Sequence, residues 1–426
     1  MPPFWQNVLR RPPNAGLASA PRAPRLLLRQ ALFYALLCAG TGATLPFMPL
    51  WLRQNGMSAN EIAWILAVPL LGRAVTGPLS GIWADRFARY RTPIAILALA
   101  ATLSYVALAY TGPGLAAGWP GYRFAAFLVL YGIGYTGITN ITPLLDAMTL
   151  QLSRVERFAF GVARAAGSAA FVFANVCLGF LLQGVGTNAA LFWMILTALM
   201  TCIGARFLLP SHIRLDLKLG LSSTPAPGLQ RLSTLLTRRG YVVLLIAIGL
   251  LQAAHSYYYA FSTIIWEKQG FSPDICGMLW ATGVAGEFAF LSLGTRLRRK
   301  LGPWTLLLIG AAAGIVRWSV MACSPPLETL WALQLLHGLS FGAVYVAGLE
   351  LVHLLVPPGF EGLGQTINSA YAGGALIGLG TIASGVIFEA AGQHGYVYMT
   401  ALSLAGSAAA LWLYARRRYL ASGTQQ

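Results

Sequence analysis

The sequence predicts an all-α integral membrane protein with twelve transmembrane helices in two pseudo-symmetric six-helix halves. The 426 residues are 57% hydrophobic and only 10% charged, with a mean hydropathy of +0.65. A soluble core cannot absorb so much apolar surface, whereas a polytopic membrane protein can. Apolar runs of about 20 residues, the length that crosses a bilayer, alternate with short loops. One long polar connection divides these runs into two sets of six.

In chain order, the apolar runs predict spans at 30–52, 60–82, 92–111, 122–150, 158–183, 188–209, 241–266, 274–295, 303–323, 328–355, 363–388 and 395–415. Residues 1–29 are rich in Pro and Arg and are expected to form a cytoplasmic N-terminal arm. Residues 210–240 carry Pro, Ser and basic residues, and we expect a cytoplasmic linker there between the halves 30–209 and 241–415. Residues 416–426 are expected to be a cytoplasmic tail.

The net charge of +17 could suggest a nucleic-acid partner, but the positions of the charges argue against one. Most of the 29 Lys and Arg residues fall in the two termini and in alternate loops. The exceptions are three residues on the other side and three inside spans: Arg53, Arg123, Lys268, Arg73, Arg164 and Arg317. This pattern follows the positive-inside rule. We therefore expect a multi-pass protein of the plasma (inner) membrane, in contact with lipid, with both termini cytoplasmic.

The two halves share weak internal similarity. Arg-Gln-Asn-Gly-Met-Ser at Arg53–Ser58, after the first span, matches Lys-Gln-Gly-Phe-Ser at Lys268–Ser272, after the seventh. The loop after the second span matches Gly294–Gly302 after the eighth, where Thr295 replaces the acid. Such paired halves predict a binding site between them at the middle of the membrane.

A charged turn, Gly81–Arg91, lies between the second and third spans. Asp85 can accept hydrogen bonds from a neighbouring helix or pair with the arginines of the turn, and so tie two helices together and release them. The alternative is a short basic loop that only fixes topology. The order Gly81, Asp85, Arg86 and Arg89 resembles the loop between helices 2 and 3 of the major facilitator superfamily, although Ala88 and Tyr90 depart from its usual Gly and basic residue.

Ionisable residues inside the spans are the candidates for function, because a charge at the bilayer centre costs at least ~2.5–3.5 kcal/mol and needs a cavity or a partner. They are Arg73, Asp146, Arg164, Glu287, Arg317, His337 and Glu350. Asp146 and Arg164 fall at similar depth and can pair, and a purely structural ion pair is the alternative to a functional one. Glu350 lies near the cytoplasmic end and is interpreted as a gate or surface residue.

Glu287, Arg317 and His337 fall at similar depth in spans eight, nine and ten and predict a proton site. Burial favours the neutral carboxyl and Arg317 favours the charged one, so small movements can switch the protonation of Glu287. A structural ion pair, with a histidine that is merely hydrogen-bonded, is the alternative for these residues.

Several segments also resemble the phenylpropionate-permease group of the superfamily, which is related to lactose permease and to nucleoside–proton symporters. They are Pro143–Leu150, Phe160–Phe171, Gly286–Leu291, Arg317-Trp318, Gln334–Gly342 and Gly364–Gly380. The resemblance implies a coupling acid at Glu287, with an arginine partner at Arg317 and a histidine at His337. It also implies a substrate- or gate-related pair at Asp146 and Arg164. Relatives often carry a Trp beside this arginine, and that aromatic surface is missing here.

Tyrosines in the fourth and seventh spans offer aromatic walls for a cavity: Tyr131, Tyr135, Tyr257, Tyr258 and Tyr259. Neighbouring residues point about 100° apart on a helix, so only one side of the seventh span can face the cavity, and Tyr258 is the candidate there. The alternative for all of them is packing or contact with lipid.

Together these observations predict a secondary active transporter that works by alternating access as a proton-coupled symporter and functions as a monomer. Three intramembrane arginines exceed what one coupling acid needs, which favours a small organic anion or aromatic acid as substrate. A proton-driven drug or metabolite exporter is the alternative. A receptor that does not transport, or a membrane-embedded enzyme, fits less well. The five cysteines are scattered singly and the five histidines lack ligand spacing, so no metal or cofactor is expected.

Overall fold

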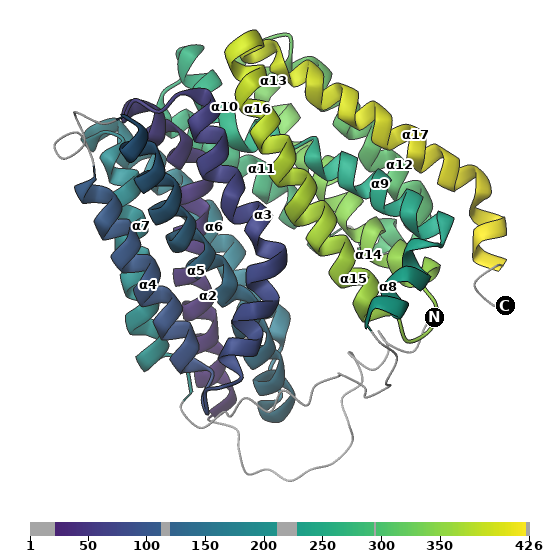
Figure 1. The fold of residues 1–426 in the computed structure, drawn as a ribbon, viewed down its shortest axis with the longest axis horizontal. Helices are drawn as coiled ribbons and strands as arrows, with labels where there is room; N and C mark the ends of the chain where they lie inside the picture. Colours follow the sequence, from purple (N-terminus) through teal and green to yellow (C-terminus); the bar gives the residue numbers. More distant parts are fainter. Residues whose placement is uncertain (1–21, 112–119, 211–227, 294, 423–426) are drawn as a thin grey trace.

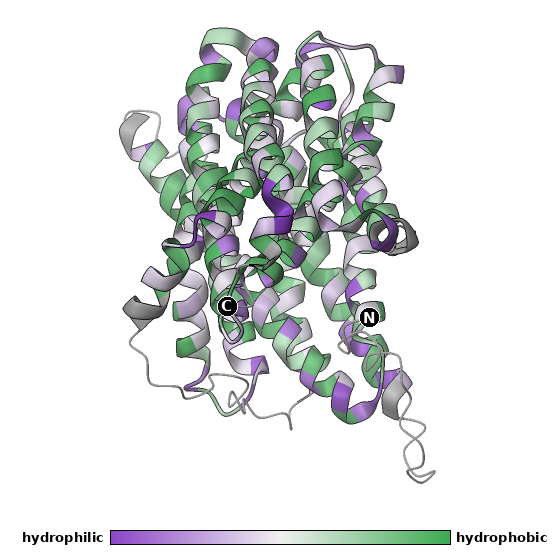
Figure 2. Cartoon of the chain, turned by 90° about the vertical axis from the view of Figure 1, so that its right-hand side faces the viewer, coloured by the Kyte–Doolittle hydropathy of each residue, from purple (hydrophilic) through white to green (hydrophobic). Residues whose placement is uncertain are grey.

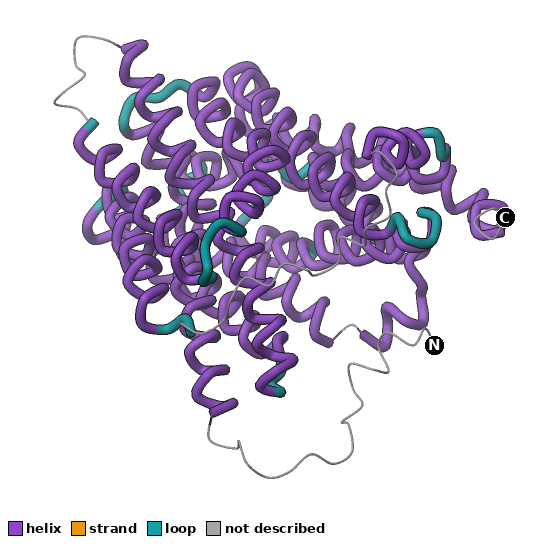
Figure 3. Tube along the Cα trace, turned by 60° about the horizontal axis from the view of Figure 1, so that its bottom comes forward, coloured by secondary structure: helices purple, strands orange, loops and turns teal. Residues whose placement is uncertain are grey.

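The computed structural model describes residues 22–111, 120–210, 228–293 and 295–422. All regular secondary structure in these ranges is helical (Figure 3). Apolar residues cover most of the length of the helices (Figure 2), as expected for segments that contact lipid.

The first half contains six long helices. They are α2 (Arg22–Gln54), α3 (Ala59–Ala84), α4 (Arg91–Tyr110), α5 (Pro120–Glu156), α6 (Phe160–Val185) and α7 (Asn188–Phe207). The second half is more broken. It contains α8 (Gly228–Leu236), α9 (Arg239–Ala253), α10 (Ser256–Lys268), α11 (Pro273–Leu293), α12 (Thr295–Met321), α13 (Leu327–Leu335), η1 (Gly338–Ala343), α14 (Val344–Leu355), α15 (Glu361–Ala370), η2 (Tyr371–Leu376), α16 (Ile377–Ala391), η3 (Gly392–Gly395) and α17 (Tyr396–Ser422).

Twelve membrane crossings follow from these elements. Within the described ranges, ten helices are long and apolar enough to cross a membrane, and the bent helix α3 makes eleven. One of the ten is the run Glu361–Leu420, which reverses at the 3-10 turn η3 and therefore crosses twice. The predicted all-α fold with two six-helix halves is confirmed.

Helices extend into three segments that the sequence assigned to the arm, linker and tail. Helix α2 begins at Arg22, eight residues before the predicted span. Its first turns are held because Leu26 and Leu27 pack against the core and Thr149 donates a hydrogen bond to buried Gln30 at 3.0 Å. Helix α8 lies within the predicted linker and buries Leu235, and α17 continues to Ser422.

Four interruptions shape the membrane-spanning helices. The seventh span breaks between α9 and α10 at Ala254 and His255. The tenth and eleventh spans contain the π-helical segments η1 and η2, a geometry that is frequent at functional sites. Helix α3 bends by 53° between Arg73 and Val75. Pro78 has no N–H to bond the carbonyl four residues earlier, which accounts for this bend.

The internal repeat has a structural counterpart. Gly56 and Gly270 follow the first and seventh spans with φ of +81° and +90°, a conformation that glycine adopts without a Cβ penalty. The Gly56 N–H donates to the Arg53 carbonyl and the Gly270 N–H to the Glu267 carbonyl, both at 2.9 Å. The matching turns show that the two halves repeat the same helix-ending geometry.

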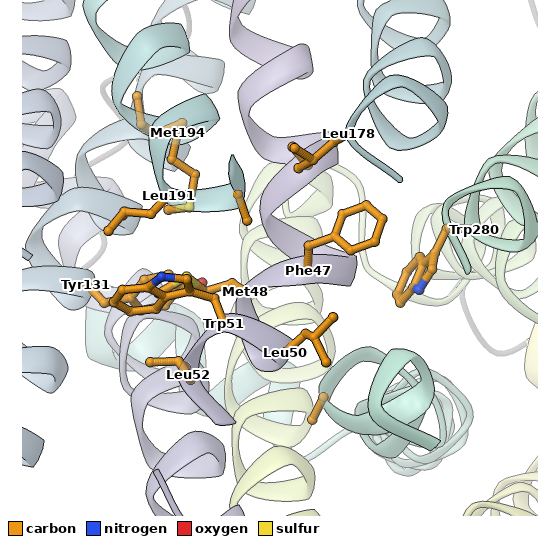
Figure 4. Close-up of a cluster of buried hydrophobic side chains, with 14 of the residues drawn as sticks. Phe47, Met48, Leu50, Trp51, Leu52, Tyr131, Leu178, Leu191, Met194 and Trp280 are labelled. Atoms are coloured by element: carbon orange, nitrogen blue, oxygen red, sulfur yellow. The ribbon is translucent and has the colours of Figure 1, made fainter. Parts of the chain in front are cut away.

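The halves meet at one end of the bundle, called here the far end; the opposite end, where α7 ends at Phe207 and α8 begins at Gly228, is called the linker end. In Figure 1 the helices of the two halves approach each other at the top, while their lower ends lie apart. At the far end, a Cβ on Gly385 of α16 would lie 2.7 Å from the Ala63 Cβ of α3, so glycine permits this close approach. Figure 4 shows Phe47 of α2 between Leu178 of α6 and Trp280 of α11, in one buried cluster across the halves.

Candidate functional site

A buried arginine organises the interior of the second half. Arg317 of α12 has no exposed surface. Its Nη1 donates to His337 Nδ1 at 2.8 Å and to Ser340 Oγ at 3.3 Å, and its Nη2 donates to Gln334 Oε1 at 2.8 Å. The planar guanidinium can serve these acceptors at once because its donors diverge in a fixed fork. Arg317 thus holds α12, α13 and η1 together.

Aromatic rings complete the surroundings of this charge. The guanidinium carbon lies 4.7 Å from the ring centroid of Tyr258 and 4.5 Å from that of Trp318. Tyr258 also donates its hydroxyl to Gln334 Oε1 at 3.0 Å. Cation–π attraction is strongest where water is excluded, so these rings offset part of the cost of burying the arginine.

The hydrogen bond from Arg317 fixes the tautomer of His337. Arginine has no acceptor, so His337 Nδ1 must be unprotonated and the neutral ring carries its hydrogen on Nε2. That Nε2 lies 3.9 Å from Oε2 of Glu287 on α11. The gap is about 1 Å longer than a normal N–H···O hydrogen bond. A small movement of either helix would therefore make or break a bond from His337 to the carboxylate.

The expectation that Arg317 pairs directly with Glu287 is wrong. His337 lies between them: its Nδ1 accepts a hydrogen bond from Arg317, and its Nε2 faces Glu287 at 3.9 Å. Their depths along the helices are similar, as predicted, but spacing along the chain cannot tell which two of three neighbouring side chains touch. The Glu287 side chain is 24% exposed, whereas Arg317 is fully buried, so the carboxyl is the member of the trio that water or a ligand can reach.

His255 is a further member of this network that sequence reasoning missed. It lies at the break between α9 and α10, with Nδ1 3.2 Å from the Leu251 carbonyl and Nε2 3.4 Å from Ser340 Oγ. Its ring centroid is 5.5 Å from that of His337. The sequence did contain a signal for it. Gln252 and His255 are polar residues three positions apart in an otherwise apolar run, and this spacing places them on the same face of a helix.

The first half contains the predicted ion pair. Arg164 of α6 donates from Nη1 to Oδ2 of Asp146 on α5, and the Tyr34 hydroxyl of α2 donates to the other carboxylate oxygen at 2.6 Å. Tyr34 was not predicted. The Arg164 and Asp146 side chains are 53% and 29% exposed, so this pair faces an open space at the helix surface.

Arg73 lies at the bend of α3 and is exposed. Within the described ranges its guanidinium has no hydrogen-bond or ion-pair partner, and Tyr135 of α5 lies within its electrostatic range. Tyr345 of α14 lies within electrostatic range of Arg164, which places a second-half residue near the first-half pair. Arg164 thus borders the space between the halves, and Arg73 is an exposed cation of the first half.

The other predicted residues divide by burial. Tyr131 is 2% exposed and stacks on Tyr135 at 5.5 Å, so it packs in the core of the first half in this conformation. Asp85 ends α3, where its backbone N–H donates to the Gly81 carbonyl. Its side chain is exposed together with Arg86 and Arg89 and forms no bond with any residue that the structure describes. Glu350 is exposed on α14.

Comparison with known proteins identifies the family. The family model described as the MFS_1 like family matches residues 27–399. This chain belongs to the major facilitator superfamily. A protein of Escherichia coli (strain K12) named "Probable 3-phenylpropionic acid transporter" is 29% identical over 374 residues, covering 87% of this chain and 93% of that protein. The maltose permease of Geobacillus stearothermophilus is 28% identical over 377 residues, covering 86% and 89%.

Solved structures agree with this assignment. The crystal structure of nucleoside transporter NupG superposes with a TM-score of 0.78 at 16% identity, covering 91% of this chain and 99% of that chain. The transporter is therefore a multi-pass secondary carrier with the fold predicted from its sequence, and it is not an enzyme.

Proposed function

We propose that this transporter moves a small organic carboxylate together with one proton by alternating access. The interior carries three arginines, Arg73, Arg164 and Arg317, against two carboxylates, Asp146 and Glu287. One positive charge is left over when both acids are ionised, and a monocarboxylate would neutralise it. The name of the Escherichia coli relative, at 29% identity, supports an aromatic acid.

Arg73 is the residue that we assign to the substrate carboxylate. Asp146 already neutralises Arg164, and Arg317 is buried behind His337 and Gln334. Arg73 alone among the three has no partner in the described part of the chain and is exposed. A guanidinium can hold a carboxylate with two parallel hydrogen bonds, which favours an acid over a neutral solute.

Glu287 is the residue that we assign to the proton, and its geometry is the observation that carries this proposal. It is partly exposed and lies 3.9 Å from an imidazole N–H whose orientation Arg317 fixes. The ionised carboxylate would gain a hydrogen bond by approaching His337, whereas the protonated acid would not need one. Protonation would therefore change the relative position of α11 and η1. A carrier with two conformations requires such a local change, because it shifts the population from one conformation to the other.

We further propose that the linker end faces the cytoplasm, because the basic residues gather in the loops of that end. The described conformation, with its halves joined at the far end, would then be open to the inside. The Asp85 turn lies at the linker end, so its exposed carboxylate fits a contact that forms only when that end closes.

The proposal is tested in proteoliposomes with an acidic exterior, by measuring uptake of labelled 3-phenylpropionate and of its uncharged amide, 3-phenylpropionamide. Wild-type protein should accumulate the acid, while the amide should only equilibrate. Arg73→Lys should keep measurable uptake because it retains the charge, and Arg73→Gln should lose it. Equal accumulation of the acid and the amide, or full uptake activity of Arg73→Gln, would refute the assigned substrate class.

A further inference from the structure

A cavity of about 320 Å³ lies between the halves at the far end, away from the arginines of the interior. Arg53 of α2 and Lys268 of α10 line it from the two halves, together with Glu389 of α16. The volume is within the range of about 300–1,000 Å³ that is usual for small-molecule sites. The cavity is outside the proton and substrate sites proposed above.

The charges of this cavity do not cancel. Glu389 is already engaged, because it accepts hydrogen bonds from the Asn60 backbone N–H at 3.3 Å and from Asn60 Nδ2 at 2.5 Å. Arg53 and Lys268 lie within electrostatic range of each other and repel. Nη1 of Arg53 is buried and has no hydrogen-bond partner among the residues that the structure describes. A buried donor without a partner is unfavourable, and more so when it is charged, so an anion that accepts a hydrogen bond from Nη1 would be stabilised here.

Part of the cavity lining is apolar and aromatic. Phe261 and Phe388 stack with ring centroids 4.4 Å apart and an interplanar angle of 11°. Lys268 Nζ lies 4.8 Å above the centroid of Phe388, so the cation is held at the edge of the aromatic wall. Met57 and Ile264 add aliphatic surface. A cation above the Phe388 ring, with a second cation, Arg53, in the same lining, matches a carboxylate on an apolar or aromatic body better than an inorganic anion, which would leave the Phe388 ring without a contact.

We infer that this cavity is a second carboxylate site, which takes the transported acid at the far end before or after it passes the interior. The choice of 3-phenylpropionate as its ligand rests on the proposed function; the chemistry of the site does not. Because α2, α10 and α16 all contribute, the site is complete only while the two halves are joined at the far end. Its ligand would therefore stabilise that conformation.

The chain offers a direct probe of this site. It has three lysines, Lys218, Lys268 and Lys300, and of the two that the structure describes, Lys268 lies at the far end and Lys300 does not. Purified wild-type protein is acylated with a water-soluble amine reagent, and the rate at each lysine is followed by mass spectrometry. With 3-phenylpropionate at ten times its Kd, the rate at Lys268 should fall about tenfold, since about a tenth of the sites stay open. The rate at Lys300 should not change, and 3-phenylpropionamide should not protect Lys268.

Two variants separate this site from the interior. Arg53→Gln should abolish protection of Lys268, while Arg53→Lys, which keeps the charge and tests folding, should retain it. Arg164→Gln should leave protection intact. An unchanged Lys268 rate with 3-phenylpropionate, or protection that survives in Arg53→Gln but is lost in Arg164→Gln, would overturn the inference. Protection without any transport in vesicles would instead refute the proposed function and leave the second site standing.

Discussion

Replacing Glu287 by glutamine is the sharpest test of proton coupling. Glutamine keeps the size of the side chain and can still accept a hydrogen bond from His337, whose Nε2 lies 3.9 Å from the carboxylate. It cannot ionise, so the proton-release step is lost while the local structure is preserved. The variant should bind substrate and exchange it across the membrane, because exchange needs no return of an empty, deprotonated carrier.

The size of the effect follows from one carboxyl carrying one proton. A monocarboxylate and a proton together carry no net charge, so the membrane potential contributes nothing to their joint movement. A gradient of one pH unit is worth about 1.4 kcal/mol per proton and should therefore concentrate the acid about tenfold. Glu287→Gln should lower this ratio to about one, the value without coupling.

The assay compares uphill uptake and equilibrium exchange of 3-phenylpropionate in the same vesicles, with and without an imposed potential. Glu328→Gln is the matched control, because Glu328 is an exposed acid in the first turn of α13, away from His337. A Glu287→Gln variant that still concentrates substrate would refute the reasoning and make Asp146 the next candidate. A wild-type ratio that rises with the imposed potential would refute the one-to-one stoichiometry.

The remaining predictions concern stability, closure and topology. Arg317→Lys should lower the apparent unfolding temperature, because a point charge cannot serve several acceptors and each lost charge-assisted hydrogen bond costs about 1.5–3 kcal/mol; an unchanged temperature contradicts the network. Gly385→Ala should push the halves apart at the far end and speed acylation of Lys268, whereas Gly362→Ala, where nothing lies within 4 Å of the added Cβ, should not. Asp85→Asn should insert normally but transport more slowly, and a normal rate argues against a latch. A membrane-impermeant label should reach residues 211–227 only from the cytoplasmic side, and labelling of intact cells from outside reverses the proposed orientation.

Sequence reasoning predicted the features that depend on local composition. Apolar runs predict the spans. A charged side chain inside a span needs a cavity or a partner, so the Asp146–Arg164 pair could be predicted from the similar depth of the two residues. The repeated turns at Gly56 and Gly270 were also visible, because a left-handed residue at a helix end leaves a glycine in the sequence.

The features that were missed depend on contacts between distant segments. Tyr34 reaches Asp146 across 112 positions, and His255 reaches Ser340 across 85. Serine, glutamine and tyrosine are common in spans, and nothing in their spacing marks those that meet a buried arginine. The π-helical segments were also invisible, since one extra residue per turn leaves the apolar pattern of Gly338–Ala343 and Tyr371–Leu376 unchanged.

Contacts at the far end allow a small tilt of the helices to produce a large displacement at the linker end. Helix α2 has 33 residues and is about 50 Å long at about 1.5 Å per residue. A tilt of about 10° about contacts near one tip would therefore sweep the opposite tip through about 9 Å. For the same reason, a displacement of a fraction of an ångström where Gly385 meets Ala63 would become a larger displacement at the other end. We therefore expect the side-chain volume at the contact between Gly385 and Ala63 to be tightly restricted, although no transported molecule needs to touch these residues.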